Sequence, residues 1–245
     1  MKSKSNSIFL TGDSRILIEF AEVCRAGGCE VSGTSNERSP LPPFIRRRSA
    51  PGRTCTLSAE LTILDRERKR KNLTMLERLL PSGTIILSSC CTVSAAEQSG
   101  WMKHPERLIG ISAFPTLVKN HVMEVTLSSR TDRELLGIAQ EFLIKMGKEI
   151  RVIQDRVGMV MPRILCQIIN EAFFGLTEGI ASPQDIDRAM KLGTGYPAGP
   201  VEWAEHIGVR EVVAVLEGLM REYAEDRYRT APLLRQLAFA EPNKP

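Results

Sequence analysis

The chain has 245 residues, of which 42% are hydrophobic and 25% charged, proportions that exclude a disordered or membrane-embedded protein and are typical of a globular one. A formal net charge of +4 favours acidic small-molecule ligands but is too small for a dedicated nucleic-acid binder. The six cysteines form no CxxC pair and no zinc-like grouping with histidine, which predicts a reduced, cytoplasmic protein without a metal site.

The first 155 residues alternate between strand and helix patterns. A short apolar run predicts a strand at 8–11 and is too brief for a signal peptide or a membrane span. The pattern is then helical up to Gly27, and residues 29–32 predict a second strand. Residues 36–53 carry four prolines and an arginine run, which predicts a loop without regular structure. Further strands are predicted at 54–64, 85–88, 108–111, 122–127 and 151–154, and helices at 65–80 and 132–146.

From Arg156 onward only helical patterns remain. The change predicts a parallel α/β domain at 1–155 and an all-α domain at 156–245. Within the second domain, Ser182 followed by proline and an acidic residue indicates a helix start. The glycines and prolines between 193 and 200 then predict a tight, rigid turn.

Residues 170–200, NEAFFGLTEGIASPQDIDRAMKLGTGYPAGP, resemble the C-terminal domain of the 3-hydroxyacyl-CoA dehydrogenase family, in which NEA…EG.ASP.DID.AM..G.G.P.GP recurs. The resemblance implies a Rossmann-like, NAD-binding domain followed by a helical domain of the 6-phosphogluconate dehydrogenase C-terminal type. It also implies NAD as cofactor, an acyl-CoA-type substrate, fatty-acid metabolism and a homodimer formed through the helical domain. Two departures are the short 36–53 segment, where the family has a pair of helices, and the lack of a GRKTGRGFY-like end.

The resemblance places the cofactor residues at four positions. The three glycines that the family carries after its first strand fall at Gly12, Ser14 and Leu17, so only the turn glycine remains. The acid that holds the adenine ribose falls at Ser35. Glu60 matches the glutamate of the family's EAV-type segment. The implied cofactor-binding residues are therefore Gly12, Ser14, Ser35 and Glu60.

The residues around this motif also fit another interpretation. Asp13 adds a negative charge beside the position meant for a pyrophosphate, and the bulk of Leu17 falls where helix and strand should touch. Residues 12–17 could thus form only a strand-to-helix turn in a Rossmann-like fold that binds no dinucleotide.

The catalytic motifs of the family are altered as well. Its histidine, in G.HFFNP, falls at Ser112, and its orienting glutamate falls twelve residues later at Glu124. The serine of NTSS falls at Cys91, and the asparagine of GF.VNR falls at Pro162. A serine hydroxyl is no base near neutral pH, a thiol is a weak donor, and proline has no N–H. Losing a positioned general base usually costs about 10²–10⁴ in rate.

Several of these side chains have a purely structural alternative. Glu124 fits a packing carboxylate as well as an orienting group, and Cys91 fits a buried, inert thiol because no histidine lies near it in sequence. His121 is expected to face away from Glu124, since side chains alternate along a strand.

Two basic stretches stand out, Arg46–Arg48 with Arg53, and residues 66–71. Acidic residues flank and interrupt the second stretch, which favours a solvated helix face; contact with the phosphates of CoA is the functional alternative. No aromatic residues alternate with these cations, so we expect no nucleic-acid partner.

Two functions follow from the resemblance. The chain is either a divergent but working NAD-linked oxidoreductase, with Glu124, Ser112 and Cys91 in its site, or a non-catalytic dimeric scaffold that binds an acyl-CoA or a partner. Its altered motifs favour weak or absent dehydrogenase activity. A separate subunit that carries an intact site is a third interpretation.

Overall fold

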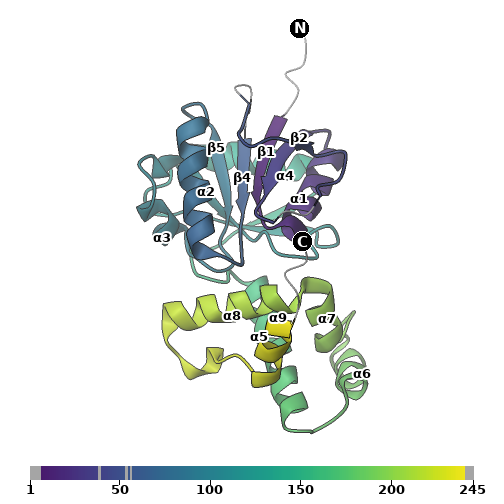
Figure 1. Ribbon diagram of the computed structural model, residues 1–245. Helices are drawn as coiled ribbons and strands as arrows, with labels where there is room; N and C mark the ends of the chain where they lie inside the picture. The colour runs from purple at the N-terminus through teal and green to yellow at the C-terminus, as the bar shows by residue number, and fades with distance from the viewer. Residues whose placement is uncertain (1–6, 38–39, 53–54, 56, 241–245) are drawn as a thin grey trace. The chain divides into compact units, whose positions relative to one another are not determined.

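The computed structural model describes residues 7–37, 40–52, 55 and 57–240, and the chain divides into two compact units (Figure 1). The first unit extends to Met159, and the second begins at Val160. The first contains a sheet with helices on both faces and the second contains helices, so the predicted Rossmann-like α/β fold followed by an all-α domain is confirmed. Among the described residues, no helix is long and apolar enough to cross a membrane.

Within the described part of the first unit, eight strands form one sheet in the order β3-β2-β1-β4-β5-β6-β7-β8. Neighbouring strands are parallel except β6 and β7, which are antiparallel. The strand order reverses between β1 and β4, and folds of this kind bind ligands at the carboxyl ends of the two strands at such a point. The strands are β1 (Ser7–Gly12), β2 (Glu30–Ser35), β3 (Arg46–Arg47), β4 (Leu57–Leu61), β5 (Ile85–Ser89), β6 (Leu108–Ile111), β7 (Val122–Thr126) and β8 (Glu149–Val152).

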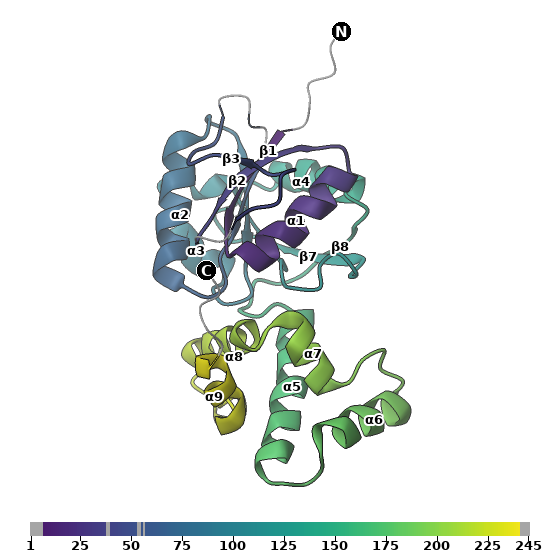
Figure 2. The ribbon, with the colours of Figure 1, turned by 45° about the vertical axis from the view of Figure 1, so that its right-hand side comes forward.

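Helices α1 and α4 cover one face of the sheet, and α2 and α3 cover the other (Figures 1 and 2). Helix α2 begins where the Asp65 carboxylate accepts a hydrogen bond from the Arg68 N–H at 2.9 Å, and it ends just before Pro81. The central strands β4 and β5 are buried along their whole length, as expected for strands covered on both faces. The helices are α1 (Ser14–Ala26), α2 (Arg66–Leu79), α3 (Ala95–Gly100) and α4 (Glu134–Lys145).

The segment at 36–53 differs from its prediction. Arg46 and Arg47 form a short parallel strand against Ser32 and Gly33 of β2, so the prediction of a loop without regular structure is wrong there. Two residues give no alternation from which a strand could be inferred. In the neighbouring predicted strand at 54–64, residues 54 and 56 lie outside the described residues.

Helix α3 gave no sequence signal, because its residues AAEQSG are small or polar and show no apolar period. Ser94 begins it by accepting a hydrogen bond from the Glu97 N–H at 3.2 Å. The Asp155 carboxylate also accepts from the Ala95 and Ala96 N–H groups, at 2.8 and 2.7 Å. A carboxylate from 59 residues further along the chain therefore helps to fix the start of α3.

The second unit is built around its longest helix, α5, which contacts α7, α8 and α9. Asn170 on α5 holds the chain before α9, because its amide donates to the Arg229 carbonyl at 2.9 Å and accepts from the Ala231 N–H at 2.8 Å. The helices are α5 (Met161–Thr177), α6 (Pro183–Thr194), α7 (Pro200–Ile207), α8 (Val209–Tyr223) and α9 (Pro232–Ala240).

The signature at 170–200 forms a joint between α6 and α7. Ser182 caps α6, and Gly195 ends it in the left-handed conformation with φ of 72°. Asp187 then accepts hydrogen bonds from the Val201 and Glu202 N–H groups, at 2.8 and 3.0 Å, and so caps α7. The capping and turn residues of the signature therefore start and end α6 and start α7.

Candidate cofactor and active site

The turn from β1 into α1 depends on Gly12. Its φ is +148°, and an added Cβ would lie 2.5 Å from the carbonyl carbon of Leu61 on β4. Leu17, at the third glycine position of the family motif, is fully buried in the core, and its N–H donates to the Asp13 carbonyl at 3.0 Å as in a regular helix. The fold therefore accommodates the leucine but not a side chain at position 12.

Ser14 and Ser35 lie together, and Glu37 joins them. The Glu37 carboxylate accepts hydrogen bonds from the Ser14 backbone N–H and the Ser35 hydroxyl, both at 2.7 Å. The Ser35 hydroxyl in turn accepts from the Glu37 N–H at 3.1 Å. An N–H group of the first turn of α1 is thus bound by a carboxylate of the chain itself.

Asp13 ties the same turn to the chain that follows β4. Only 4% exposed, its carboxylate accepts from the Ile63 and Leu64 N–H groups at 2.6 and 2.9 Å and from the Asn36 amide at 2.9 Å. Burial raises the pKa of Asp13 against the opposing effect of these hydrogen bonds, and the nearby Glu37 carboxylate raises it further.

This arrangement can be tested against the shape and charge of a dinucleotide. In Rossmann-type folds the pyrophosphate lies on N–H groups at the start of the first helix. Here Glu37 holds the Ser14 N–H, and Asp13 holds two further N–H groups at the same edge. Glu37 thus takes up one N–H donor at the start of α1, and both carboxylates repel a pyrophosphate placed at this edge. The residues described at this edge do not fit the cofactor.

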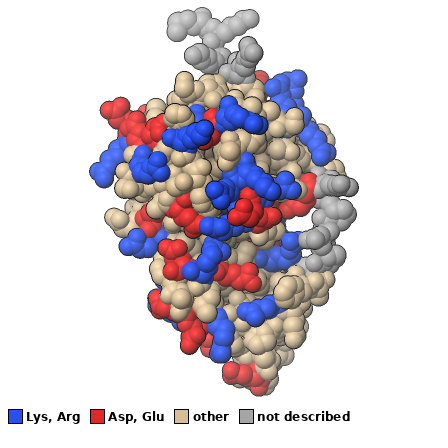
Figure 3. Space-filling model, turned by 60° about the vertical axis from the view of Figure 1, so that its left-hand side comes forward, with Lys and Arg blue, Asp and Glu red and all other residues tan. Residues whose placement is uncertain are grey.

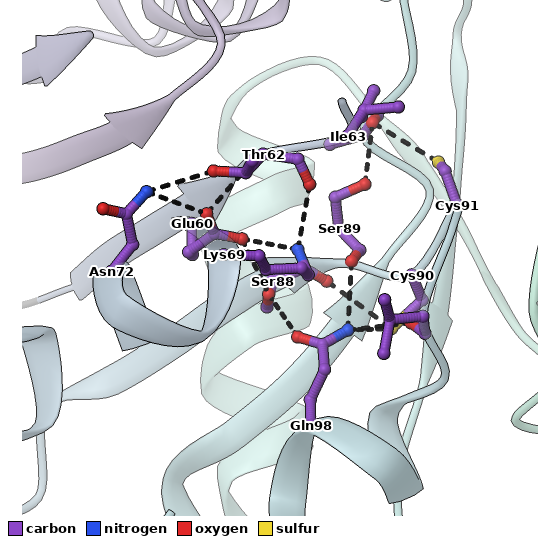
Figure 4. A network of polar contacts seen from close by, with 12 residues as sticks. Glu60, Thr62, Ile63, Lys69, Asn72, Ser88, Ser89, Cys90, Cys91 and Gln98 are labelled. Atoms are coloured by element: carbon purple, nitrogen blue, oxygen red, sulfur yellow. Dashed lines mark hydrogen bonds and ion pairs between the residues drawn. The ribbon is translucent and has the colours of Figure 1, made fainter. Parts of the chain in front are cut away.

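Glu60, the fourth cofactor position, is fully buried at the carboxyl end of β4 (Figure 4). Its carboxylate pairs with the Lys69 ammonium at 2.5 Å and accepts from the Asn72 amide at 3.3 Å and the Ser88 hydroxyl at 3.4 Å. Figure 4 shows Lys69 and Asn72 reaching from α2 and Gln98 from α3 into one network. Glu60 therefore anchors α2 to the sheet in this structure.

Ser112 and Glu124 are adjacent across the antiparallel step from β6 to β7. The Ser112 N–H donates to the Glu124 carbonyl, and the Glu124 N–H donates to the Ser112 hydroxyl, both at 2.9 Å. The Ser112 hydroxyl also lies 3.8 Å from the Met123 sulfur. Both side chains are nearly buried, whereas His121 is exposed. The expected adjacency of Ser112 and Glu124 is thus present, but position 112 carries a hydroxyl rather than a base.

Cys91 lies just beyond β5, beside this pair. It is fully buried, and its thiol donates to the Ala113 carbonyl at 3.4 Å. Burial raises the pKa of Cys91 to about 12, with a further contribution from the nearby Glu124 carboxylate. Such a thiol stays protonated and unreactive at neutral pH.

Other predicted features lie elsewhere. Pro162 is buried in the first turn of α5, in the second unit. Within the described part of the chain, no three His, Cys, Asp or Glu side chains group so that they could hold a metal ion. On the basic helix α2, Arg66 pairs with Glu97 and stacks on Trp101. Arg68, Arg70 and Lys71 are exposed, as predicted for a solvated helix face, whereas Lys69 of the same stretch is buried. On the face shown in Figure 3, Lys and Arg side chains lie among Asp and Glu.

Sequence reasoning missed the carboxylates that accept hydrogen bonds from N–H groups at this edge, above all Glu37. One signal could have found it, because an acid stands two residues beyond Ser35, where the family places its ribose-binding acid. The acceptor role of Asp13 had no such signal, since its donors lie 50 and 51 residues away in the sequence.

Two models of one family match the chain. The 3-hydroxyacyl-CoA dehydrogenase NAD binding domain matches residues 49–156, and the C-terminal domain of the same family matches residues 158–243. Gly12, Ser14, Ser35 and Glu37 all lie before the matched part of the NAD binding domain.

Individual relatives agree with this match. The chain is 33% identical over 180 residues to 3-hydroxybutyryl-CoA dehydrogenase of Bradyrhizobium diazoefficiens, covering 74% of this chain and 61% of that protein. It is 45% identical over 100 residues to 3-hydroxyadipyl-CoA dehydrogenase of Escherichia coli, covering 41% and 21%. The chain thus spans less than two thirds of the length of these relatives.

The fold is also similar to that of a solved structure, (S)-3-hydroxybutyryl-CoA dehydrogenase PaaH1 from Ralstonia eutropha. The TM-score is 0.79 at 24% identity, over 96% of this chain and 94% of that one. The family itself rests on the two matched domain models, which together cover most of the chain. The chain belongs to the 3-hydroxyacyl-CoA dehydrogenase family.

Proposed function

We propose that this chain is a 3-hydroxyacyl-CoA dehydrogenase-like protein with weak or no dehydrogenase activity, which binds an acyl-CoA-type molecule or a partner as a dimer. One observation carries the proposal: the Asp13 and Glu37 carboxylates accept hydrogen bonds from the N–H groups at the edge where the family binds NAD. A dinucleotide must displace Glu37 and approach Asp13 against its charge.

The catalytic corner supports the same conclusion. Removing a proton from a 3-hydroxyl requires a base, and Ser112 offers only a hydroxyl that already accepts a hydrogen bond from the Glu124 N–H. Without the base, the expected loss is about 10²–10⁴ in rate. The buried, protonated Cys91 thiol cannot replace it.

The dimeric part of the proposal rests on the second unit. Ile180 and Leu192 expose 72% and 77% of their surface, and Phe239 exposes 82%. Apolar side chains exposed to this extent on one small unit favour a covering partner. The family resemblance makes a second copy of the chain the partner we propose, in the cytoplasm.

The test is a comparison of turnover and binding. NADH oxidation with acetoacetyl-CoA should be at least about 10²-fold slower for the wild-type chain than for the Bradyrhizobium relative, the active control, and unchanged in Glu124→Gln. Calorimetric binding of acetoacetyl-CoA without NADH supports the ligand-binding part. Turnover by the wild type that disappears in Glu124→Gln contradicts the proposal and favours the working oxidoreductase.

A further inference from the structure

A pocket opens at the edge of the sheet where β1 and β2 begin. Its volume of about 490 Å³ falls within the range of small-molecule sites. Ser7 and Glu30, the first residues of the two strands, line it together with residues of the 44–55 segment. Gly12 and Ser35 end the same strands five residues later, so the pocket lies roughly 17 Å from the cofactor edge.

Strand β3 and the residue after it contribute two arginines to the lining of this pocket. Arg46 lies opposite Ser32 in the backbone pairing of β3 with β2, and the Arg48 N–H donates to the Gly33 carbonyl at 3.0 Å. The backbones of Arg46 and Arg48 are therefore fixed to the sheet. Side chains alternate along a strand. Arg46 and Arg48 accordingly line the pocket, and Arg47 does not.

These two guanidinium groups are not neutralised by the part of the chain that the structure describes, since none of its ion pairs includes either arginine. Gly52 leaves room for one of them, because a Cβ there would lie 3.0 Å from the Nη1 of Arg48. Glu30 is the one acidic residue among those that line the pocket. The lining therefore carries a net positive charge.

The rest of the lining is uncharged and partly apolar. Burial raises the pKa of the Cys29 and Cys55 thiols, so both are neutral at pH 7. The Arg25 guanidinium lies over the Phe44 ring, 4.9 Å from its centroid. Such a lining suits the organic part of a ligand whose anionic group binds the arginines.

We propose that this pocket binds a phosphorylated small molecule, with Arg46 and Arg48 on the phosphate and Glu30 accepting from a hydroxyl of the ligand. Guanidinium groups form paired, charge-assisted hydrogen bonds with phosphate oxygens, and two of them match a phosphate dianion. The site is separate from the edge at which the family binds its cofactor, and it does not depend on dehydrogenase activity.

Titration calorimetry at fixed ionic strength tests the proposal with ribose 5-phosphate, inorganic phosphate and ribose. We expect saturable binding of ribose 5-phosphate in the millimolar range or tighter, and none of ribose. The double variant Arg46→Gln/Arg48→Gln should weaken it about tenfold to a hundredfold. Arg47→Gln removes one positive charge between the two positions but outside the pocket lining, and it should change the affinity less than twofold.

The controls separate the outcomes. Equal affinity for inorganic phosphate identifies free phosphate as the ligand, whereas tighter binding of ribose 5-phosphate identifies a phosphate ester. Cys29 and Cys55 line the pocket and Cys24 does not, so the ligand should slow iodoacetamide labelling of Cys29 and Cys55 and leave that of Cys24 unchanged. A wild-type chain that binds neither phosphate, or an Arg47→Gln variant that loses as much affinity as the double variant, overturns the proposal.

Discussion

Asp13 and Glu37 use their carboxylates on backbone N–H groups at the edge where the family binds NAD. Sequence could indicate that Gly12 makes the turn, because a strand-to-helix motif of this kind needs a glycine there. It could not indicate that Glu37 binds the Ser14 N–H, since 23 residues separate the two and no periodicity connects them. The sequence therefore predicted which positions form the site, but not which hydrogen bonds their side chains make.

At position 12 a substitution tests the close approach of β1 and β4. Gly12→Ala should lower the free energy of unfolding by about 3 kcal/mol or more, through its positive φ and the contact of the new Cβ with Leu61. Gly83→Ala is the matched control, because Gly83 has φ of +83° but nothing within 4 Å of an added Cβ. Urea unfolding measures both, and equal losses would contradict a role for the close approach.

At the scale of elements, the long and patterned ones were predictable. The helices at 65–80 and 132–146 correspond to α2 and α4 within a few residues, because apolar periodicity and Pro81 define them. The short elements β3 and α3 were not, since their existence depends on pairing with β2 and on the distant Asp155. Tertiary contacts determine such elements, and local sequence does not.

The joint between α6 and α7 yields a prediction at this scale. Asp187→Ala removes the acceptor for two N–H groups of α7 and should destabilise the chain by about 1–2 kcal/mol in urea unfolding. Asp226→Ala is the control: Asp226 is exposed, and no described residue donates to its side chain, so we expect a change within about 0.5 kcal/mol. Equal effects would show that Asp187 does not act as the cap.

For the whole molecule, the change of pattern near residue 155 predicted an α/β part followed by a helical part, and the two compact units have these classes. The signature at 170–200 identified the family, and the matches to both family domains confirm it. Assembly is not visible in one chain, so the dimer stays a prediction.

Light scattering after gel filtration tests the dimer. We expect twice the chain mass for the wild type and a monomer for Ile180→Glu/Leu192→Glu, because charges on these exposed apolar side chains disrupt an apolar interface. Ile144→Glu alters a similarly exposed side chain, 59%, on α4 of the first unit and should stay dimeric. A wild-type monomer, or a double variant that stays dimeric, contradicts an interface at these residues.

The central claim is that the chain's own carboxylates close the cofactor edge. Calorimetric titration of NADH into the wild-type chain, with and without acetoacetyl-CoA, tests it most directly. The claim predicts no saturable binding at millimolar NADH, because Glu37 holds the Ser14 N–H at the start of α1 and the Glu37 and Asp13 carboxylates repel a pyrophosphate there. Micromolar NADH binding by the wild-type chain would contradict it and return the dehydrogenase interpretation to first place.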